Sequence, residues 1–228
     1  FLEGKHALER PKPTNAVSRA LQHDLSDVVG QEQGKRGLEI TAAGGHNLLL
    51  IGPPGTGKTM LASRINGLLP DLSNEEALES AAILSLVNAE SVQKQWRQRP
   101  FRSPHHSASL TAMVGGGAIP GPGEISLAHN GVLFLDELPE FERRTLDALR
   151  EPIESGQIHL SRTRAKITYP ARSIACRGDE SQPTGHYQGN HNRCTPEQTL
   201  RYLNRLSGPF STASISHWRS HYRLPAFE

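Results

Sequence analysis

The sequence has few cysteines, no long apolar run and no excess of charge of one sign. Its 228 residues include only two cysteines, Cys176 and Cys194, so it lacks the disulfide framework of a small secreted protein and fits a reducing cytoplasm. No apolar run approaches the length of a membrane span and no signal peptide opens the chain, so we expect no membrane association. Because Phe1 rather than Met comes first, we expect an internal piece of a longer protein.

The charge balance and the length further limit the possible partners and the number of domains. With 25 Lys and Arg against 23 Asp and Glu, bulk charge does not indicate a nucleic-acid binder, and any such role must come from local clusters. The length suffices for one large domain with a proper core. Residues 1–25 are polar, and Pro11 and Pro13 interrupt any helix there, so we expect this segment to be a linker from a preceding domain.

A glycine-rich segment is the strongest motif in the chain. It reads Gly52, Pro53, Pro54, Gly55, Thr56, Gly57, Lys58 and Thr59. An apolar run, 47–51, is predicted to be a strand before it, and residues 60–65 read as the start of a helix after it, which is the context of a phosphate-binding loop. Glycines let backbone N–H groups point at phosphates, Lys58 can reach the β- and γ-phosphates, and the Thr59 hydroxyl can hold Mg²⁺. The flanking strand and helix disfavour the alternative of a Gly/Pro turn with a chance Gly-Lys-Thr, so the sequence predicts a nucleotide-binding protein.

A second signal is a pair of carboxylates directly after an apolar run. Residues 131–135 read as a buried parallel strand, which would deliver Asp136 and Glu137 at the edge of the sheet where ligands of open α/β folds bind. Asp136 would complete the Mg²⁺ site with Thr59, and Glu137 would orient and activate the attacking water, so Glu137 and Lys58 are the predicted catalytic residues. The alternative is a strand followed by an ordinary helix start, because acidic residues favour a first turn.

Other segments carry weaker signals. Helices are predicted over 32–43, 74–87 and 142–154, the second with a capping box formed by Ser73 and Glu76. Residues 98–123 are rich in glycine and proline and are predicted to be a loop or hairpin insertion outside the core. Within it, His105 and His106 are candidate metal ligands, but no Cys, Asp or Glu lies nearby at ligand spacing, which favours a positioning role in a loop or interface.

An alternating stretch, 158–169, contains basic residues two positions apart, namely Arg162, Arg164 and Lys166. On a strand this spacing places all of them on one face. Pointed into a pore, such a basic stripe could follow a phosphate backbone, whereas on a solvated hairpin it would have no special role. The spacing alone favours neither reading.

These motifs together resemble one family. The glycine-rich loop is joined by Arg-Ser-Pro-His-His at 102–106, Pro-Gly-Glu-Ile-Ser-Leu-Ala-His-Asn-Gly at 122–131, Leu-Asp-Glu-Leu-Pro-Glu-Phe at 135–141, and Arg-Glu-Pro at 150–152 with the hairpin after it. From Phe1 to Phe210 the sequence resembles the magnesium-chelatase-like AAA+ ATPases, specifically the YifB/ComM competence-protein branch. This combination is far more specific than a phosphate-binding loop alone.

The resemblance implies an α/β fold of the P-loop NTPase (AAA+) type over residues 26–210, with a parallel sheet flanked by helices. It also implies a helix-2 insertion around 98–123 and a pre-sensor β-hairpin around 156–169. The family resembles DNA branch-migration helicases of natural transformation, and it implies hexameric rings with ATP and Mg²⁺ between subunits, a Lon-like domain before the ATPase domain and a helical lid after it. By analogy, Val29 and Gly30 would lie near the adenine, and the basic hairpin residues would face DNA.

Two segments depart from the family: residues 173–182 and an aberrant tail, 211–228. Where the family has an apolar strand ending in a water-polarising Asn, roughly Phe-Gln-Leu-Val-Ala-Ala-Met-Asn-Pro-Ser, this chain has a polar run. One codon choice for the family text, read from the third base of its Gln codon, encodes residues 175–182, and a one-base shift similarly explains 211–218, so we interpret both segments as frame-shifted. Because the sensor Asn is missing and a polar run is unsuited to a central strand, we expect poor nucleotide binding or marginal folding around 173–182, and little hydrolysis.

Three functions remain open at this stage. The first is a DNA-remodelling ATPase motor, which the basic hairpin and the insertion favour. The second is the motor subunit of a metal chelatase, and the third is a nucleotide-binding module without useful turnover, which the damaged sensor region favours. Cys194 alone remains of a cysteine-rich knuckle found in many relatives, so we predict no zinc, and a capped helix is predicted over 195–206.

Overall fold

The structure is a computed structural model, and the part of the chain that it describes includes both predicted carboxylates and most of the glycine-rich loop. It describes residues 24–52, 55–117, 120–162, 165–179 and 216–219, with the backbone alone at 162, 165 and 216–219. The predicted helix 195–206, Cys194 and nearly all of the predicted linker 1–25 lie outside these residues. Among the described helices, none is long and apolar enough to cross a membrane.

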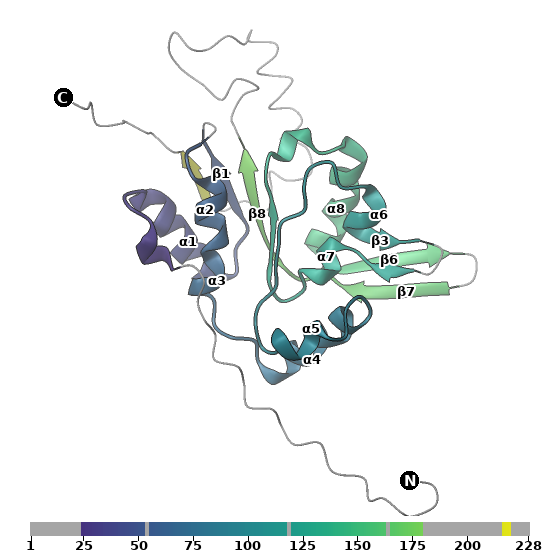
Figure 1. Ribbon diagram of the computed structural model, residues 1–228. Coiled ribbons are helices and arrows are strands. Elements are labelled where there is room, and N and C mark those ends of the chain that lie inside the picture. The colour runs from purple at the N-terminus through teal and green to yellow at the C-terminus, as the bar shows by residue number, and fades with distance from the viewer. Residues whose placement is uncertain (1–23, 53–54, 118–119, 163–164, 180–215, 220–228) are drawn as a thin grey trace, which may run out of the picture.

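A five-stranded parallel sheet forms the centre of the fold, with the strand order β2-β5-β8-β1-β9 (Figure 1). The strands are β1 (Leu48–Ile51), β2 (Phe101–Arg102), β5 (Val132–Leu135), β8 (Ile174–Asp179) and β9 (Ser216–Arg219). All residues of β5 are buried, as its continuous apolar sequence predicts for a parallel strand covered on both faces. β9 belongs to the tail that was expected to be aberrant, and its backbone pairs with β1 at the sheet edge. The predicted α/β class with a parallel sheet is confirmed.

Helices cover both faces of this sheet. They are α1 (Glu32–Gly44), α2 (Lys58–Ser63), α3 (Ile65–Leu68), α4 (Asn74–Ser85), α5 (Ser91–Lys94), α6 (Leu110–Val114), α7 (Glu124–Leu127) and α8 (Arg143–Ser155), with short 3-10 turns η1 (Leu25–Asp27) and η2 (Leu138–Glu140). Side chains of β5 alternate between the two layers. Val132 and Phe134 join the buried cluster formed with α1, α2 and α3, whereas Leu133 and Leu135 join the cluster formed with α6, α7 and α8 (Figure 1).

The helices predicted over 32–43, 74–87 and 142–154 are present, with ends that differ by one or two residues. α1 is closed by Gly45 in the left-handed conformation, with φ of 63°. The capping box of α4 is formed as predicted: the Glu76 N–H donates to Ser73 Oγ at 3.2 Å, and the Ser73 N–H donates to Glu76 Oε2 at 2.9 Å. α4 ends at Ser85, two residues before the predicted end.

The segment 98–123 is not wholly outside the core, so that prediction was wrong in part. Phe101 pairs with Val132 in the sheet, and Met113 of α6 is fully buried in the cluster on the α8 side. β2 has only two residues, too few to show a strand period among its proline and arginine neighbours. The insertion proper therefore runs from the end of β2 through α6 to a short antiparallel pair of strands.

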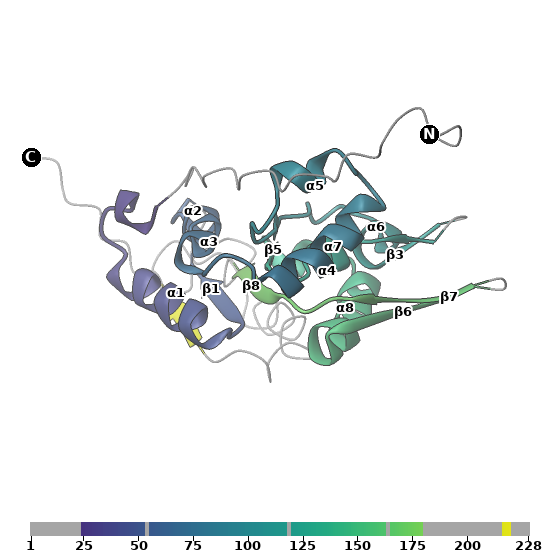
Figure 2. The same cartoon turned by 90° about the horizontal axis from the view of Figure 1, so that it is seen from below.

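The predicted β-hairpin is present and projects from the body of the molecule beside the insertion (Figure 2). The hairpin consists of β6 (Gln157–Arg162) and β7 (Ala165–Pro170), and the insertion carries β3 (Gly115–Gly116) and β4 (Gly121–Pro122). Oη of Tyr169 donates to the carbonyl of Pro120 at 3.1 Å, which ties the hairpin to the insertion.

The basic residues of the hairpin do not lie on one strand, so that expectation was wrong. Arg162 ends β6 and Lys166 lies in β7, while Arg164 lies outside the described residues. The register puts Arg162 and Lys166 in successive cross-strand pairs, which alternate between the two faces of a hairpin. The basic residues recur every second position in the sequence although the two strands end and begin between them, which is why the pattern resembled a single strand.

β8 corrects the expectation for residues 173–182. Residues 174–179 form the strand between β5 and β1 and pair with both, so the prediction that this run is unsuited to a central strand was wrong. The polar run does bury charged side chains. One of them is Arg177, which is only 1% exposed. Burial lowers the pKa of Arg177 to about 10 and raises the pKa of the neighbouring Cys176 thiol to about 12.

The burial of Arg177 predicts how the stability of the fold depends on pH. The free energy of unfolding of the wild type, relative to that of Arg177→Met, should rise as the pH increases above about 10, because folded Arg177 releases its proton at a lower pH than unfolded Arg177 does. Denaturant unfolding of both proteins across this pH range measures the effect.

The matched control is Arg36→Met, which removes a guanidinium whose side chain is 72% exposed on α1. This substitution should change the free energy of unfolding by less than about 0.5 kcal/mol. A difference in stability between the wild type and Arg177→Met that stays constant as the pH rises through about 10 would contradict the burial of Arg177 in a central strand.

Candidate nucleotide and magnesium site

The glycine-rich loop leaves the C-terminal end of β1 and leads into α2. Gly55 and Gly57 have φ values of 76° and 83°, in the left-handed region that glycine adopts without steric cost. Lys58 begins α2 and points back into the loop, where its Nζ donates to the carbonyl of Gly52 at 3.0 Å. Because Lys58 is only 6% exposed, its ammonium group is held in the loop rather than in solvent. Of the predicted loop residues, Pro53 and Pro54 lie outside the described part of the chain.

The loop and the carboxylate after β5 meet at one point. Oγ1 of Thr59 donates a hydrogen bond of 2.6 Å to Oδ2 of Asp136. β8 lies between β1 and β5, the strands that precede these residues, and its Gly178 leaves the necessary room, because a Cβ there would collide with Oδ1 of Asp136. A hydroxyl and a carboxylate are ligands that Mg²⁺ takes in nucleotide sites, so this donor pair fits the predicted ion.

Glu137 follows Asp136 in an unusual backbone conformation. Its φ of 52° and ψ of 47° lie in the left-handed region, which is uncommon for a residue with a side chain. Its N–H donates to Oδ1 of Asp136 at 3.1 Å, and its Oε2 lies 2.9 Å from Nδ1 of His106. The structure therefore places the predicted water-activating carboxylate next to the predicted Mg²⁺ ligand and against a histidine from the insertion.

Sequence reasoning placed His106 in a loop but missed its contact with Glu137. The signal was indirect: β2 pairs with β5, so the residues that follow both strands leave the sheet at the same edge. Within the described residues no group of three His, Cys, Asp or Glu side chains could hold a metal ion. His105, the other member of the pair, instead contacts Ser107, with Nδ1 2.9 Å from Oγ.

The segment predicted to lie near the adenine is close to the loop. Val29 is 92% exposed beside the buried Val28, and Gly30 has φ of 69°. Gln31, which the sequence did not single out, donates from Nε2 to the carbonyl of Thr56 at 3.3 Å and so joins this segment to the glycine-rich loop. The adenine-binding role of Val29 and Gly30 stays a prediction.

Comparison with known proteins places this arrangement in a family. The family model for magnesium chelatase, subunit ChlI, matches residues 24–213. The chain belongs to the magnesium-chelatase family. Within it, the chain is 94% identical to "Uncharacterized protein YifB" of Escherichia coli K12 over 210 residues, and 64% identical to "Competence protein ComM" of Haemophilus influenzae over 217 residues. Each match covers 92% of this chain and 42% of the relative, so the chain spans less than half the length of these magnesium-chelatase-like proteins.

Solved structures of similar fold are AAA+ proteins. One is the BchI–BchD complex of magnesium chelatase, with a TM-score of 0.54 and 22% identity, covering 81% of this chain and 66% of that chain. Another is NtrX from Brucella abortus in complex with ADP, with a TM-score of 0.53 and 15% identity, covering 84% of this chain and 36% of that chain. These likenesses confirm the predicted P-loop NTPase fold of this magnesium-chelatase-family chain.

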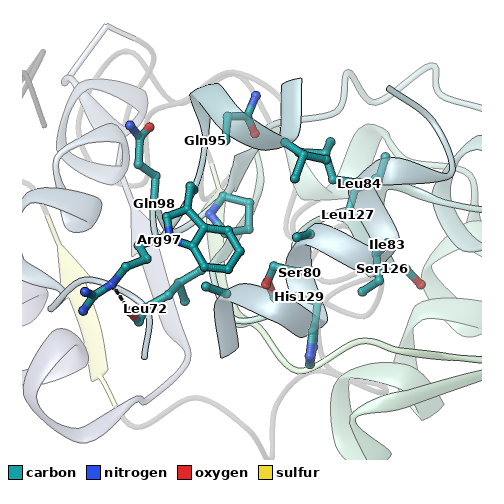
Figure 3. Close-up of a pocket in the computed structure, with 15 residues that line it drawn as sticks. Leu72, Ser80, Ile83, Leu84, Gln95, Arg97, Gln98, Ser126, Leu127 and His129 are labelled. Carbon is teal, nitrogen blue, oxygen red and sulfur yellow. Dashed lines mark hydrogen bonds between the residues drawn. The ribbon is translucent and has the colours of Figure 1, made fainter. Parts of the chain in front are cut away.

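The cavity drawn in Figure 3 lies apart from the glycine-rich loop. It has a volume of about 30 Å³, and residues of α4, α5 and α7 and of the segments beside them line it, including Leu72, Ser80, Arg97 and His129. This volume holds about two water molecules and is far too small for a nucleotide. The predicted nucleotide site is instead the surface formed by the loop and the carboxylates.

The contact between Thr59 and Asp136 predicts how nucleotide affinity depends on magnesium. Thr59→Ala removes the hydroxyl and should lower the affinity for ATP in the presence of Mg²⁺ by roughly tenfold, while leaving the weak affinity without Mg²⁺ unchanged. Thr59→Ser retains the hydroxyl and serves as the matched control, with near wild-type affinity. Titration with a fluorescent ATP analogue, with and without Mg²⁺, measures both values. Equal losses in the Ala and Ser variants would exclude Thr59 as a ligand.

Proposed function

We propose that the chain is the ATPase portion of a cytoplasmic, DNA-remodelling motor that acts as a ring-shaped homo-oligomer of six subunits. The observation that carries the proposal is the 2.6 Å contact between Thr59 of α2 and Asp136, which follows β5 beside Glu137. A magnesium-dependent ATPase needs this combination of phosphate loop, metal ligand and base at one sheet edge. The activity of the whole protein, including branch migration of DNA during natural transformation, belongs to the same proposal.

Each residue of the site has a separate task in ATP hydrolysis. Backbone N–H groups of the glycine-rich loop bind phosphate oxygens, and Lys58 places its ammonium charge on the β- and γ-phosphates. Thr59 and Asp136 would hold Mg²⁺, which would supply positive charge to the transferring phosphoryl group. Glu137 orients the attacking water and accepts its proton at the carboxylate.

DNA is the proposed substrate because of the hairpin and the relatives. The hairpin projects away from α1 and α2, and Lys166 on it is exposed, so this lysine is available to a phosphate backbone (Figure 2). Its tie to the insertion through Tyr169 gives the two elements one common surface. The 64% identity to a protein named for competence supports a role in DNA uptake, and it exceeds the 27% identity to the magnesium-chelatase 38 kDa subunit of Rhodobacter capsulatus, which would support a chelatase motor.

One observation favours a second candidate, a nucleotide-binding module without useful turnover. Arg177 pairs in register with Leu135, the residue before Asp136, so the frame-shifted strand directly borders the catalytic carboxylates. The position expected to hold the sensor Asn is Glu180, which lies outside the described residues. Tight ATP binding without hydrolysis would support this candidate.

The ATPase rate with and without forked DNA tests the proposal. We expect DNA to stimulate hydrolysis, and Glu137→Gln to lower kcat by about 100-fold or more because a general base is lost. The variant Arg162→Ser/Arg164→Ser/Lys166→Ser should lose the stimulation, and the dependence of DNA affinity on salt should fall by about three counterions if all of them contact phosphates.

The matched control changes the same number of charges elsewhere. Arg36→Ser/Arg143→Ser/Arg150→Ser removes exposed arginines of α1 and α8, and it should retain both the stimulation and the salt dependence. Equal losses in both triple variants would show only a bulk-charge effect and would reject the hairpin as the DNA contact. Hydrolysis that DNA leaves unchanged would reject the DNA-remodelling function.

A further inference from the structure

We propose that His106 is a positioning residue for Glu137, acting through a hydrogen bond from its Nδ1 to the Glu137 carboxylate. The inference rests on the proposed ATPase function, since it assigns the group that holds the water-activating base. It adds to the site a residue of the insertion, which contributes neither to the glycine-rich loop nor to the carboxylate strand.

The fold brings the two residues together at the edge of the sheet. β2 ends at Arg102 and β5 ends at Leu135, and because the two strands are parallel neighbours, the segments after them leave at the same side. Nδ1 of His106 lies 2.9 Å from Oε2 of Glu137, a distance typical of a hydrogen bond to a carboxylate. The side chains are 32% and 48% exposed, so water can reach the carboxylate while the imidazole holds one of its oxygens.

The imidazole of His106 is itself held in place. Its ring lies 4.0 Å from the ring of His105, centroid to centroid, and meets the ring of Phe141 edge-on at 6.5 Å. Before it in the chain, Arg102 forms two hydrogen bonds of 2.6 Å with Glu124, which anchor the start of the segment. Because the imidazole of His106 is held in place, its hydrogen bond can hold the Glu137 carboxylate in one position.

Glu137 needs such a partner because its backbone conformation does not hold its side chain. The left-handed φ of 52° directs the chain away from the strand, and the N–H bond to Asp136 fixes the backbone only. A free glutamate side chain samples several rotamers, and only some of them place the carboxylate where a water in line with the γ-phosphate would lie. The bond to His106 selects among them, and Nδ1 can donate it in the neutral Nδ1–H tautomer as well as in the imidazolium.

Four substitutions separate this role from a merely structural one. His106→Ala should lower kcat by about tenfold with KM for ATP unchanged, because binding does not involve Glu137. His106→Asn places an amide N–H near the position of Nδ1 and should restore most of kcat, whereas His106→Gln, whose amide reaches the position of Nε2, should not. His46→Ala is the matched control, because His46 precedes β1 at the edge of the sheet opposite to the glycine-rich loop, and this variant should hydrolyse ATP at close to the wild-type rate.

A second measurement does not depend on turnover. In protein labelled with ¹⁵N-histidine, the ring nitrogen shifts of His106 should show a hydrogen-bonded Nδ1–H in the wild type, and this signal should be lost in Glu137→Ala. A chain without any hydrolysis would reject the proposed ATPase function, and the nitrogen shifts would then decide the contact alone. The proposal is overturned if His106→Ala keeps or raises kcat, if Gln rescues as well as Asn, or if the Nδ1 signal is unaffected by Glu137→Ala.

Discussion

The position of Asp136 against Thr59 is the constraint on which the rest of the site depends. The two residues are joined by a single 2.6 Å hydrogen bond, and each is placed by a different strand of the parallel sheet. Parallel strands end at a common edge of the sheet. The glycine-rich loop after β1 and the carboxylates after β5 are therefore brought together by the strand order, in which only β8 separates β1 from β5. Lys58 and Glu137 then take their places because each directly adjoins one member of this pair.

β8, the strand between β1 and β5, makes room for the site and also buries a charged side chain. β8 supplies Gly178, whose missing side chain gives Asp136 its room, and it also buries the guanidinium of Arg177 in the middle of the sheet. Burial lowers the pKa of Arg177, so the strand that aligns the site also carries a desolvated charge. This links the stability of the sheet centre to the geometry of the catalytic edge.

Much of the fold and the site could be predicted from the sequence, and the exceptions have physical causes. The glycine-rich loop, the strand before Asp136 and the capping box at Ser73 are local patterns whose chemistry requires particular residues at fixed spacing, so they were found. β2 is too short to show a period, and the basic residues recur at a spacing of two in the sequence although β6 ends at Arg162 and β7 begins at Ala165.

The remaining exceptions are matters of tertiary structure. β8 was rejected on composition, but small residues and pairing on both sides let a polar run occupy a central strand. The contact between His106 and Glu137 depends on strand order, which the chain around each residue does not encode. Neither could be derived from local pattern, because both follow from which strands become neighbours.

A crystal structure of the chain with Mg²⁺ and a non-hydrolysable ATP analogue tests the central claim most directly. The account predicts a triphosphate wrapped by the backbone N–H groups of the glycine-rich loop, with one Mg²⁺ about 2.1 Å from Thr59 Oγ1 and held by Asp136, directly or through a bound water. Phosphates bound elsewhere, or Thr59 and Asp136 too far apart to share one ion, would contradict it.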